Sequence, residues 1–139
     1  MSIPVDGYAH VRLTVTDIAR SRAFYDRVFA LPVAFELPPD ADEETRRALG
    51  FLDGGVVYHL GAGLLGLRPV APADDRFDED RVGLDHLSFA VPTADDLHAA
   101  AALLDDAGIA HEGVKDIGVA SILEFRDPDG IALELIAGA

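Results

Sequence analysis

Two histidines and one glutamate occupy positions at which their side chains can hold a metal ion. His10 opens the stretch His-Val-Arg-Leu-Thr-Val, and His86 opens the similar stretch His-Leu-Ser-Phe-Ala-Val. Glu134 lies near the end of the chain, between two leucines. The matching stretches indicate an internal duplication. Because imidazole and carboxylate groups bind divalent ions, the sequence predicts a metal site assembled between the two halves.

The composition restricts the partners that the chain can have. It has 139 residues, of which 50% are hydrophobic, and both values suit one globular domain. With 25 Asp and Glu against 11 Lys and Arg, the net charge is −14, which argues against nucleic acid and anionic membranes as partners. There is no cysteine, so a metal needs nitrogen and oxygen ligands. The sequence shows neither a signal peptide nor a membrane span, and we expect a cytoplasmic protein that binds a small molecule.

The first half reads as a strand, a helix and three further strands. Apolar and polar residues alternate over residues 8–15, as in a half-buried strand that carries His10 and Arg12 on one face. Asp17 is a suitable N-cap for an amphipathic helix over residues 18–30. The remaining segments are predicted as strands at 33–37 and 64–70, with a short helix at 40–49. Residues 51–60 are predicted as a strand pair or as one long strand broken at Gly54-Gly55.

The second half repeats this order of elements. A strand over residues 86–91 precedes a helix that a Thr93 and Asp96 capping box starts and Gly108 ends. Three more strands are predicted at 109–114, 119–125 and 131–136, the last after the turn Asp-Pro-Asp-Gly at residues 127–130. Residues 71–83 are polar and aperiodic and read as a linker. We therefore predict a single domain, with module one at residues 5–70 and module two at residues 84–137.

One face of each predicted sheet must be covered by the helix of its module. The opposite face carries His10 in the first half, and His86 and Glu134 in the second. If the two sheets combine, these polar faces line a shared concave cup.

The order of these residues resembles the vicinal oxygen chelate superfamily, which includes glyoxalase I, extradiol dioxygenases, and fosfomycin and bleomycin resistance proteins. The resemblance rests on His10, His86, the turn at 127–130 and Glu134, and it covers almost the whole chain. It implies an α+β fold of two βαβββ modules whose mixed sheets form a cup, and it implies a homodimer. It also implies that His10, His86 and Glu134 bind a divalent ion of Fe, Mn, Zn or Ni. The fourth ligand position of glyoxalase I falls near residues 65–68, where the sequence has no such side chain.

The resemblance implies a metal-dependent lyase, isomerase or transferase. Its small substrate would chelate the ion through two neighbouring oxygens, which the metal would polarise as a Lewis acid. Two alternatives remain open. One is an extradiol-type dioxygenase, and the other is a metal-free protein that sequesters a cationic drug, as bleomycin resistance proteins do.

Two further residues, with Glu134, are candidates for catalysis. Arg12 either clamps an anionic group of the substrate or pairs with an acidic neighbour. Glu124 can act as a base if its side chain faces the site. A single histidine at the start of a strand is more often a surface residue than a ligand, but the equivalent positions of His10 and His86 favour the metal. His59 is a weaker candidate for the same cup.

Overall fold

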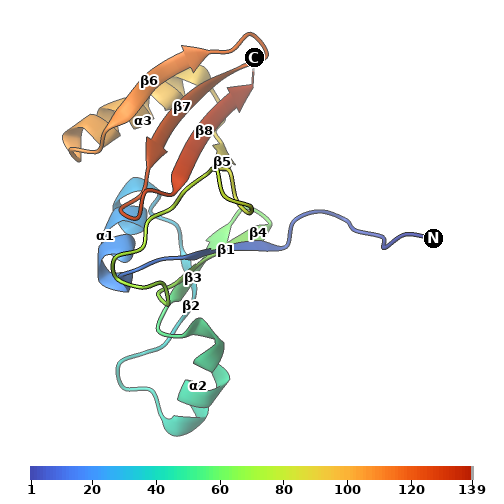
Figure 1. The fold of residues 1–139 in the computed structure, drawn as a ribbon, viewed down its shortest axis with the longest axis vertical. Coiled ribbons are helices and arrows are strands. Elements are labelled where there is room, and N and C mark those ends of the chain that lie inside the picture. The colour runs from blue at the N-terminus through green and yellow to red at the C-terminus, as the bar shows by residue number, and fades with distance from the viewer. Residues whose placement is uncertain (139) are drawn as a thin grey trace. The chain divides into compact units, whose positions relative to one another are not determined.

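The computed structural model describes residues 1–138, and the chain divides into two compact units, residues 1–74 and residues 75 onward. The first unit contains β1 (His10–Thr14), α1 (Ile18–Val28), β2 (Val33–Glu36), α2 (Glu43–Ala48), the 3-10 turn η1 (Gly50–Leu52), β3 (Val56–Leu60) and β4 (Gly63–Arg68). The second unit contains β5 (Leu87–Ala90), α3 (Ala94–Asp106), β6 (His111–Asp116), β7 (Ala120–Arg126) and β8 (Ala132–Gly138). Figure 1 shows these elements along the chain.

Each unit builds a four-stranded mixed sheet, and the two sheets have equivalent strand orders. The order is β1-β4-β3-β2 in the first and β5-β8-β7-β6 in the second. In both sheets the first strand of the unit pairs in parallel with the last, and the other neighbours are antiparallel. This equivalence confirms the predicted α+β fold of two βαβββ modules, with α2 and η1 inserted in the first.

In module one, the helix α1 starts at the predicted cap and packs by its aromatic side. The Asp17 side chain accepts a hydrogen bond from the Arg20 backbone N–H at 3.0 Å. Tyr25 on α1 is fully buried, as are Leu65 and Leu67 on β4. The alternation of β1 places Leu13 in this core, so the neighbouring side chains of the strand remain on the other face.

In module two, the helix α3 lies along one face of the sheet (Figure 1). Thr93 and Asp96 form the predicted capping box at its start. Leu97 and Leu104 of the helix are buried, and on β8 the side chains of Leu133 and Leu135 are buried as well. Because side chains alternate along a strand, Glu134 projects from the opposite face of β8.

One predicted strand begins later than expected. Residues 51–55 were predicted as part of a strand, but Phe51 lies in η1 and β3 begins only at Val56. Asp53 and Gly54 both take left-handed backbone angles, with φ of 50° and 83°, and so turn the chain before the strand. Because the chain turns here, Phe51 lies outside β3 and its side chain is exposed.

The segment before β5 is attached to the turn between β7 and β8. The Phe77 backbone N–H donates to the Asp129 carbonyl at 3.0 Å, and Arg76 donates to the Pro128 carbonyl at 2.9 Å. These contacts explain why the second unit starts at residue 75. No helix within residues 1–138 is both long and apolar enough to cross a membrane.

The turn at residues 127–130 depends on the side chain of Asp127, which is only 5% exposed. Its Oδ1 accepts hydrogen bonds from the backbone N–H groups of Asp129 and Ile131, each at 2.9 Å. Gly130 has a φ of 82°, a conformation that glycine adopts without strain. The buried carboxylate therefore satisfies two backbone donors of the turn and of the start of the last strand.

We predict that Asp127→Ala lowers the free energy of unfolding by about 2 to 4 kcal/mol, because two buried N–H groups lose their acceptor. Urea denaturation followed by circular dichroism measures the change. Asp74→Ala, at an exposed position, is the matched control and should leave the midpoint unchanged. A loss below about 0.5 kcal/mol for Asp127→Ala would contradict this account of the turn.

Candidate functional site

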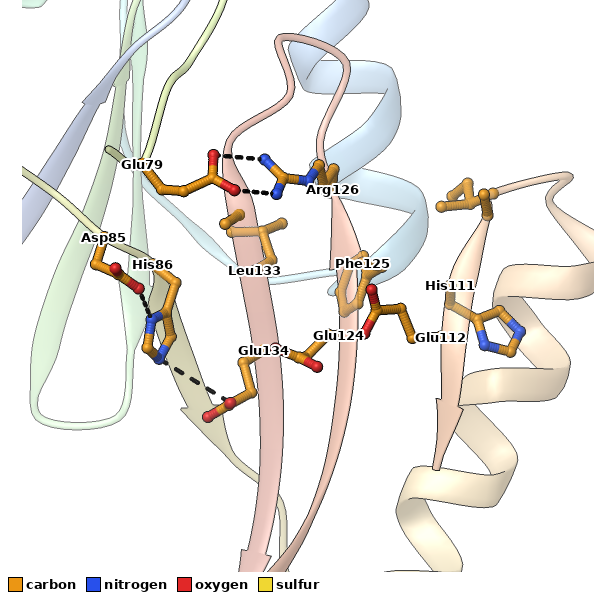
Figure 2. A pocket seen from close by; sticks show the side chains of 13 residues that line it. Glu79, Asp85, His86, His111, Glu112, Glu124, Phe125, Arg126, Leu133 and Glu134 are labelled. Carbon is orange, nitrogen blue, oxygen red and sulfur yellow. Dashed lines mark hydrogen bonds and ion pairs between the residues drawn. The ribbon is translucent and has the colours of Figure 1, made fainter. Parts of the chain in front are cut away.

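Module two contains a hollow of about 430 Å³ that polar side chains line (Figure 2). Its walls come from β6, β7 and β8 and from the segment that leads into β5. The ionisable residues in its lining are Glu79, Asp85, His86, His111, Glu112, Glu124, Arg126 and Glu134. Two of the three predicted metal ligands, His86 and Glu134, therefore share one hollow within a single module.

The imidazole of His86 lies between two carboxylates (Figure 2). Its Nδ1 is 2.5 Å from Asp85 Oδ1, and its Nε2 is 4.0 Å from Glu134 Oε2. Ser88 and Glu134 are direct partners in the parallel pairing of β5 with β8. Ser88 Oγ donates to Glu134 Oε1 at 2.7 Å, so the second oxygen of this carboxylate is left to face the imidazole.

These contacts determine the protonation chemistry of His86. The hydrogen bond to Asp85, with further attraction from Glu134, raises the pKa of the imidazole above its usual value of 6.5. When the ring is neutral, the Asp85 carboxylate favours the proton on Nδ1 and leaves the Nε2 lone pair toward Glu134. A carboxylate that holds the distal nitrogen in this way is the usual partner of a metal-binding histidine.

The donor pair lies close to the spacing that a divalent ion requires. With metal–ligand bonds of about 2.1 Å, neighbouring donors at octahedral or tetrahedral angles lie about 3.0 to 3.4 Å apart. His86 Nε2 and Glu134 Oε2 are 4.0 Å apart, so both could bind one ion only after the two side chains approach each other by somewhat under about 1 Å. Among residues 1–138 no group of three His, Asp or Glu side chains is arranged to bind a metal.

The side chain of Glu124 lies on the same face as Glu134, because the two residues are opposite each other in the antiparallel pairing of β7 with β8. This orientation is the condition under which Glu124 was predicted to act as a base. Its Oε2 accepts a hydrogen bond from Lys115 Nζ at 3.1 Å. Lys115 also pairs with Glu112, and these interactions raise the pKa of Lys115 and lower that of Glu112.

A bidentate ion pair forms part of the lining of the hollow (Figure 2). Arg126 donates to both carboxylate oxygens of Glu79, at 2.5 and 3.1 Å. The hydrogen bonds from Arg126 lower the pKa of Glu79 to about 2. Arg126 also donates to the Gly130 carbonyl at 2.9 Å, so the pair connects the segment before β5 to the turn.

The other two predicted site residues belong to module one. His10 and Arg12 line a separate, mostly apolar hollow in that module. Arg12 Nη2 donates to the Phe51 carbonyl at 2.6 Å, and the structure gives it no carboxylate partner within residues 1–138. The remaining histidines have other positions. His59 and His98 are exposed, and His111 contacts Asp105 at 2.9 Å.

Sequence reasoning did not identify the residues that orient the donor pair. Asp85 stands directly before His86, and Ser88 stands two positions after it, on the same face of β5. The two-residue spacing from His86 could therefore have identified Ser88 from the sequence. Asp85 precedes the strand, and no periodicity determines which way its side chain points.

The comparisons with known proteins agree with this fold. The family model described as Glyoxalase/Bleomycin resistance protein/Dioxygenase superfamily matches residues 7–135. A glyoxylase/bleomycin resistance protein/dioxygenase domain from Frankia sp. EAN1pec is 31% identical, with a TM-score of 0.77 over 98% of this chain and 94% of that chain. The comparison with curated proteins gives no match.

Two more distant structures share the fold. A lactoylglutathione lyase from Agrobacterium tumefaciens is 21% identical, with a TM-score of 0.70 over 98% of this chain and 96% of that chain. A variant of the fosfomycin resistance protein FosX from Listeria monocytogenes, solved with Mn(II) and 1S,2S-dihydroxypropylphosphonic acid, is 15% identical, with a TM-score of 0.74 over 98% of this chain and 95% of that chain. The family match spans nearly the whole sequence, and this chain belongs to the Glyoxalase/Bleomycin resistance protein/Dioxygenase superfamily.

Proposed function

We propose that the protein is a metal-dependent enzyme of the vicinal oxygen chelate type that acts on a small oxygenated substrate. The observation that carries the proposal is the oriented donor pair of module two, His86 Nε2 and Glu134 Oε2, at 4.0 Å. We assign His10 as the third ligand, because its position in module one is equivalent to that of His86 in module two. His10 is the first residue of β1, and His86 directly precedes β5, the corresponding strand. The FosX structure with Mn(II) has the same fold, and this supports a divalent ion as the cofactor.

A bound divalent ion supplies Lewis acidity, which polarises two neighbouring oxygens of a chelating substrate. Around it, the residues of this chain position donors and move protons. Asp85 keeps the proton of neutral His86 on Nδ1, and Ser88 keeps one oxygen of Glu134 engaged, so that each donor presents a single atom.

Proton transfer to or from the substrate is assigned to Glu124. It lies beside Glu134 on the same face of the sheet and lines the same hollow. Its partner Lys115 holds the carboxylate by one oxygen, at 3.1 Å, which leaves the other oxygen to accept a proton. The lyase and isomerase chemistry of this superfamily type needs such a base next to the chelated substrate.

Part-burial of Glu134 gives a physical reason for a cation at this position. Its side chain is only 14% exposed, and an ionised carboxylate in such a place needs a positive partner. Protonated His86 can supply that charge in the metal-free protein, and a divalent ion can supply it when bound. A proton and a metal ion therefore compete for the same place beside Glu134.

We predict that the purified protein retains about one ion per chain after incubation with excess Mn(II), Zn(II) or Ni(II) and desalting. His86→Ala and Glu134→Ala should each abolish this retention. Their circular dichroism spectra should match that of the wild-type protein. Elemental analysis measures the ratio. Glu112→Gln is the matched control, because it removes a charge from the same hollow without removing a proposed ligand. Retention of a full equivalent by His86→Ala, or equal loss in the control, would refute the assignment.

We also predict a pH dependence of metal uptake. Because the pKa of His86 is raised above 6.5, its imidazole stays protonated to higher pH, and uptake should fall as the pH is lowered through that raised value. NMR titration of the histidine ring protons in metal-free protein gives the pKa. Asp85→Asn should move it downward, since the largest cause of the shift is removed. A His86 pKa at or below 6.5 in the wild-type protein would show that the Asp85 contact does not form.

A further inference from the structure

The hollow of module one has walls suited to an aromatic ring. Its volume is about 190 Å³, and its apolar lining consists of Val11, Phe35, Phe51, Val57 and Leu64. An apolar cavity of about 150 Å³ is large enough to hold benzene. The hollow therefore has room for one six-membered ring with a short substituent.

Two of its phenylalanines expose ring surface that no core packing covers. Phe35 is 44% exposed and Phe51 is 53% exposed. Their ring centroids are 6.2 Å apart and their planes meet at 75°, which is an edge-to-face pair. Aromatic rings favour offset or edge-to-face contacts with one another, so an aromatic ligand can add a third ring to this pair.

The cation in the hollow has no acidic partner. Arg12 donates from Nη2 to the Phe51 carbonyl, and its buried Nε has no hydrogen-bond partner. Arg22, Arg68 and Arg126 each pair with a carboxylate, whereas Arg46 and Arg76 donate to backbone carbonyls as Arg12 does. Of these three carbonyl-bound arginines, Arg12 is the one that lines an apolar hollow. Within residues 1–138, and in a chain with 25 acidic residues, no carboxylate neutralises Arg12. A fixed guanidinium next to apolar walls is a recognition group for a carboxylate.

The neighbouring strand is fitted to this arginine. Arg12 on β1 pairs with Gly66 on β4. A Cβ atom added at Gly66 would lie 2.9 Å from Arg12 Cγ, closer than such contacts normally occur. The absence of a side chain at Gly66 is therefore what allows the stem of Arg12 to lie across β4.

We propose that this hollow binds an aromatic ring that carries a carboxylate, with the ring against Phe35 and Phe51 and the carboxylate on Arg12. The inference rests on the proposed function, because it names the substrate class of the site to which His10 is assigned. It also resolves the two interpretations of Arg12 in favour of an anion clamp over an internal ion pair.

Titration of metal-free protein with phenylacetate, in the presence of a chelator and followed by NMR of labelled backbone amides, tests the proposal. Benzyl alcohol, which lacks the charge, and acetate, which lacks the ring, are the matched probes. We expect phenylacetate to bind with shifts confined to the strands of module one, and both analogues to bind at least about tenfold more weakly.

Three variants test the individual contacts. Arg12→Met removes the charge and should weaken phenylacetate binding by about tenfold or more. Phe51→Ala keeps the backbone carbonyl that holds Arg12 and should weaken it by about fivefold. Gly66→Ala should weaken it as well, since the added methyl group displaces the Arg12 stem. Arg47→Met, on the exposed helix α2, is the control and should bind like the wild-type protein.

Equal affinity for phenylacetate and benzyl alcohol, unchanged affinity in Arg12→Met, or no binding by folded wild-type protein would overturn the inference. Metal retention is measured on chelator-free samples of the same purified proteins. Normal metal retention without phenylacetate binding defeats the substrate class and leaves the proposed function standing. Phenylacetate binding without metal retention defeats the proposed metal site and leaves the aromatic carboxylate as the ligand of the module-one hollow.

Discussion

The parallel pairing of the first and last strands within each module determines which side chains can act together. In module two this pairing sets Ser88 beside Glu134, although 45 residues of helix, strands and turns separate them, and it places His86 at the entry to the same pair of strands. In module one it sets Arg12 beside Gly66. Since side chains alternate along each strand, the register determines which residues of neighbouring strands lie side by side on the same face.

The two modules carry different residues at equivalent positions. Arg12 follows His10 by the same spacing that Ser88 follows His86, and the strand partners of the two residues are Gly66 and Glu134. Gly66 is therefore the module-one counterpart of Glu134, the residue that we propose as a ligand. The position that lacks a metal-binding side chain is filled by the stem of Arg12.

Much of this arrangement could be predicted from the sequence, because it depends on short-range patterns. Period-two alternation identified the faces of β1 and β8, and the Asp-Pro-Asp-Gly turn fixed the start of the last strand. The face of Glu124 could not be predicted, since it depends on how β7 pairs across that turn with β8. The position of Phe51 was also out of reach, because two successive residues with positive φ, one of them Asp53, end η1 before β3.

We propose that two imidazoles and one carboxylate hold a divalent ion in this protein. The most direct test is X-ray absorption spectroscopy of the protein loaded with about one zinc ion per chain, because multiple scattering from imidazole rings reports the number of bound histidines. The account predicts two histidines, with oxygen atoms completing the coordination shell. A shell of oxygen atoms alone, with no imidazole, would contradict it.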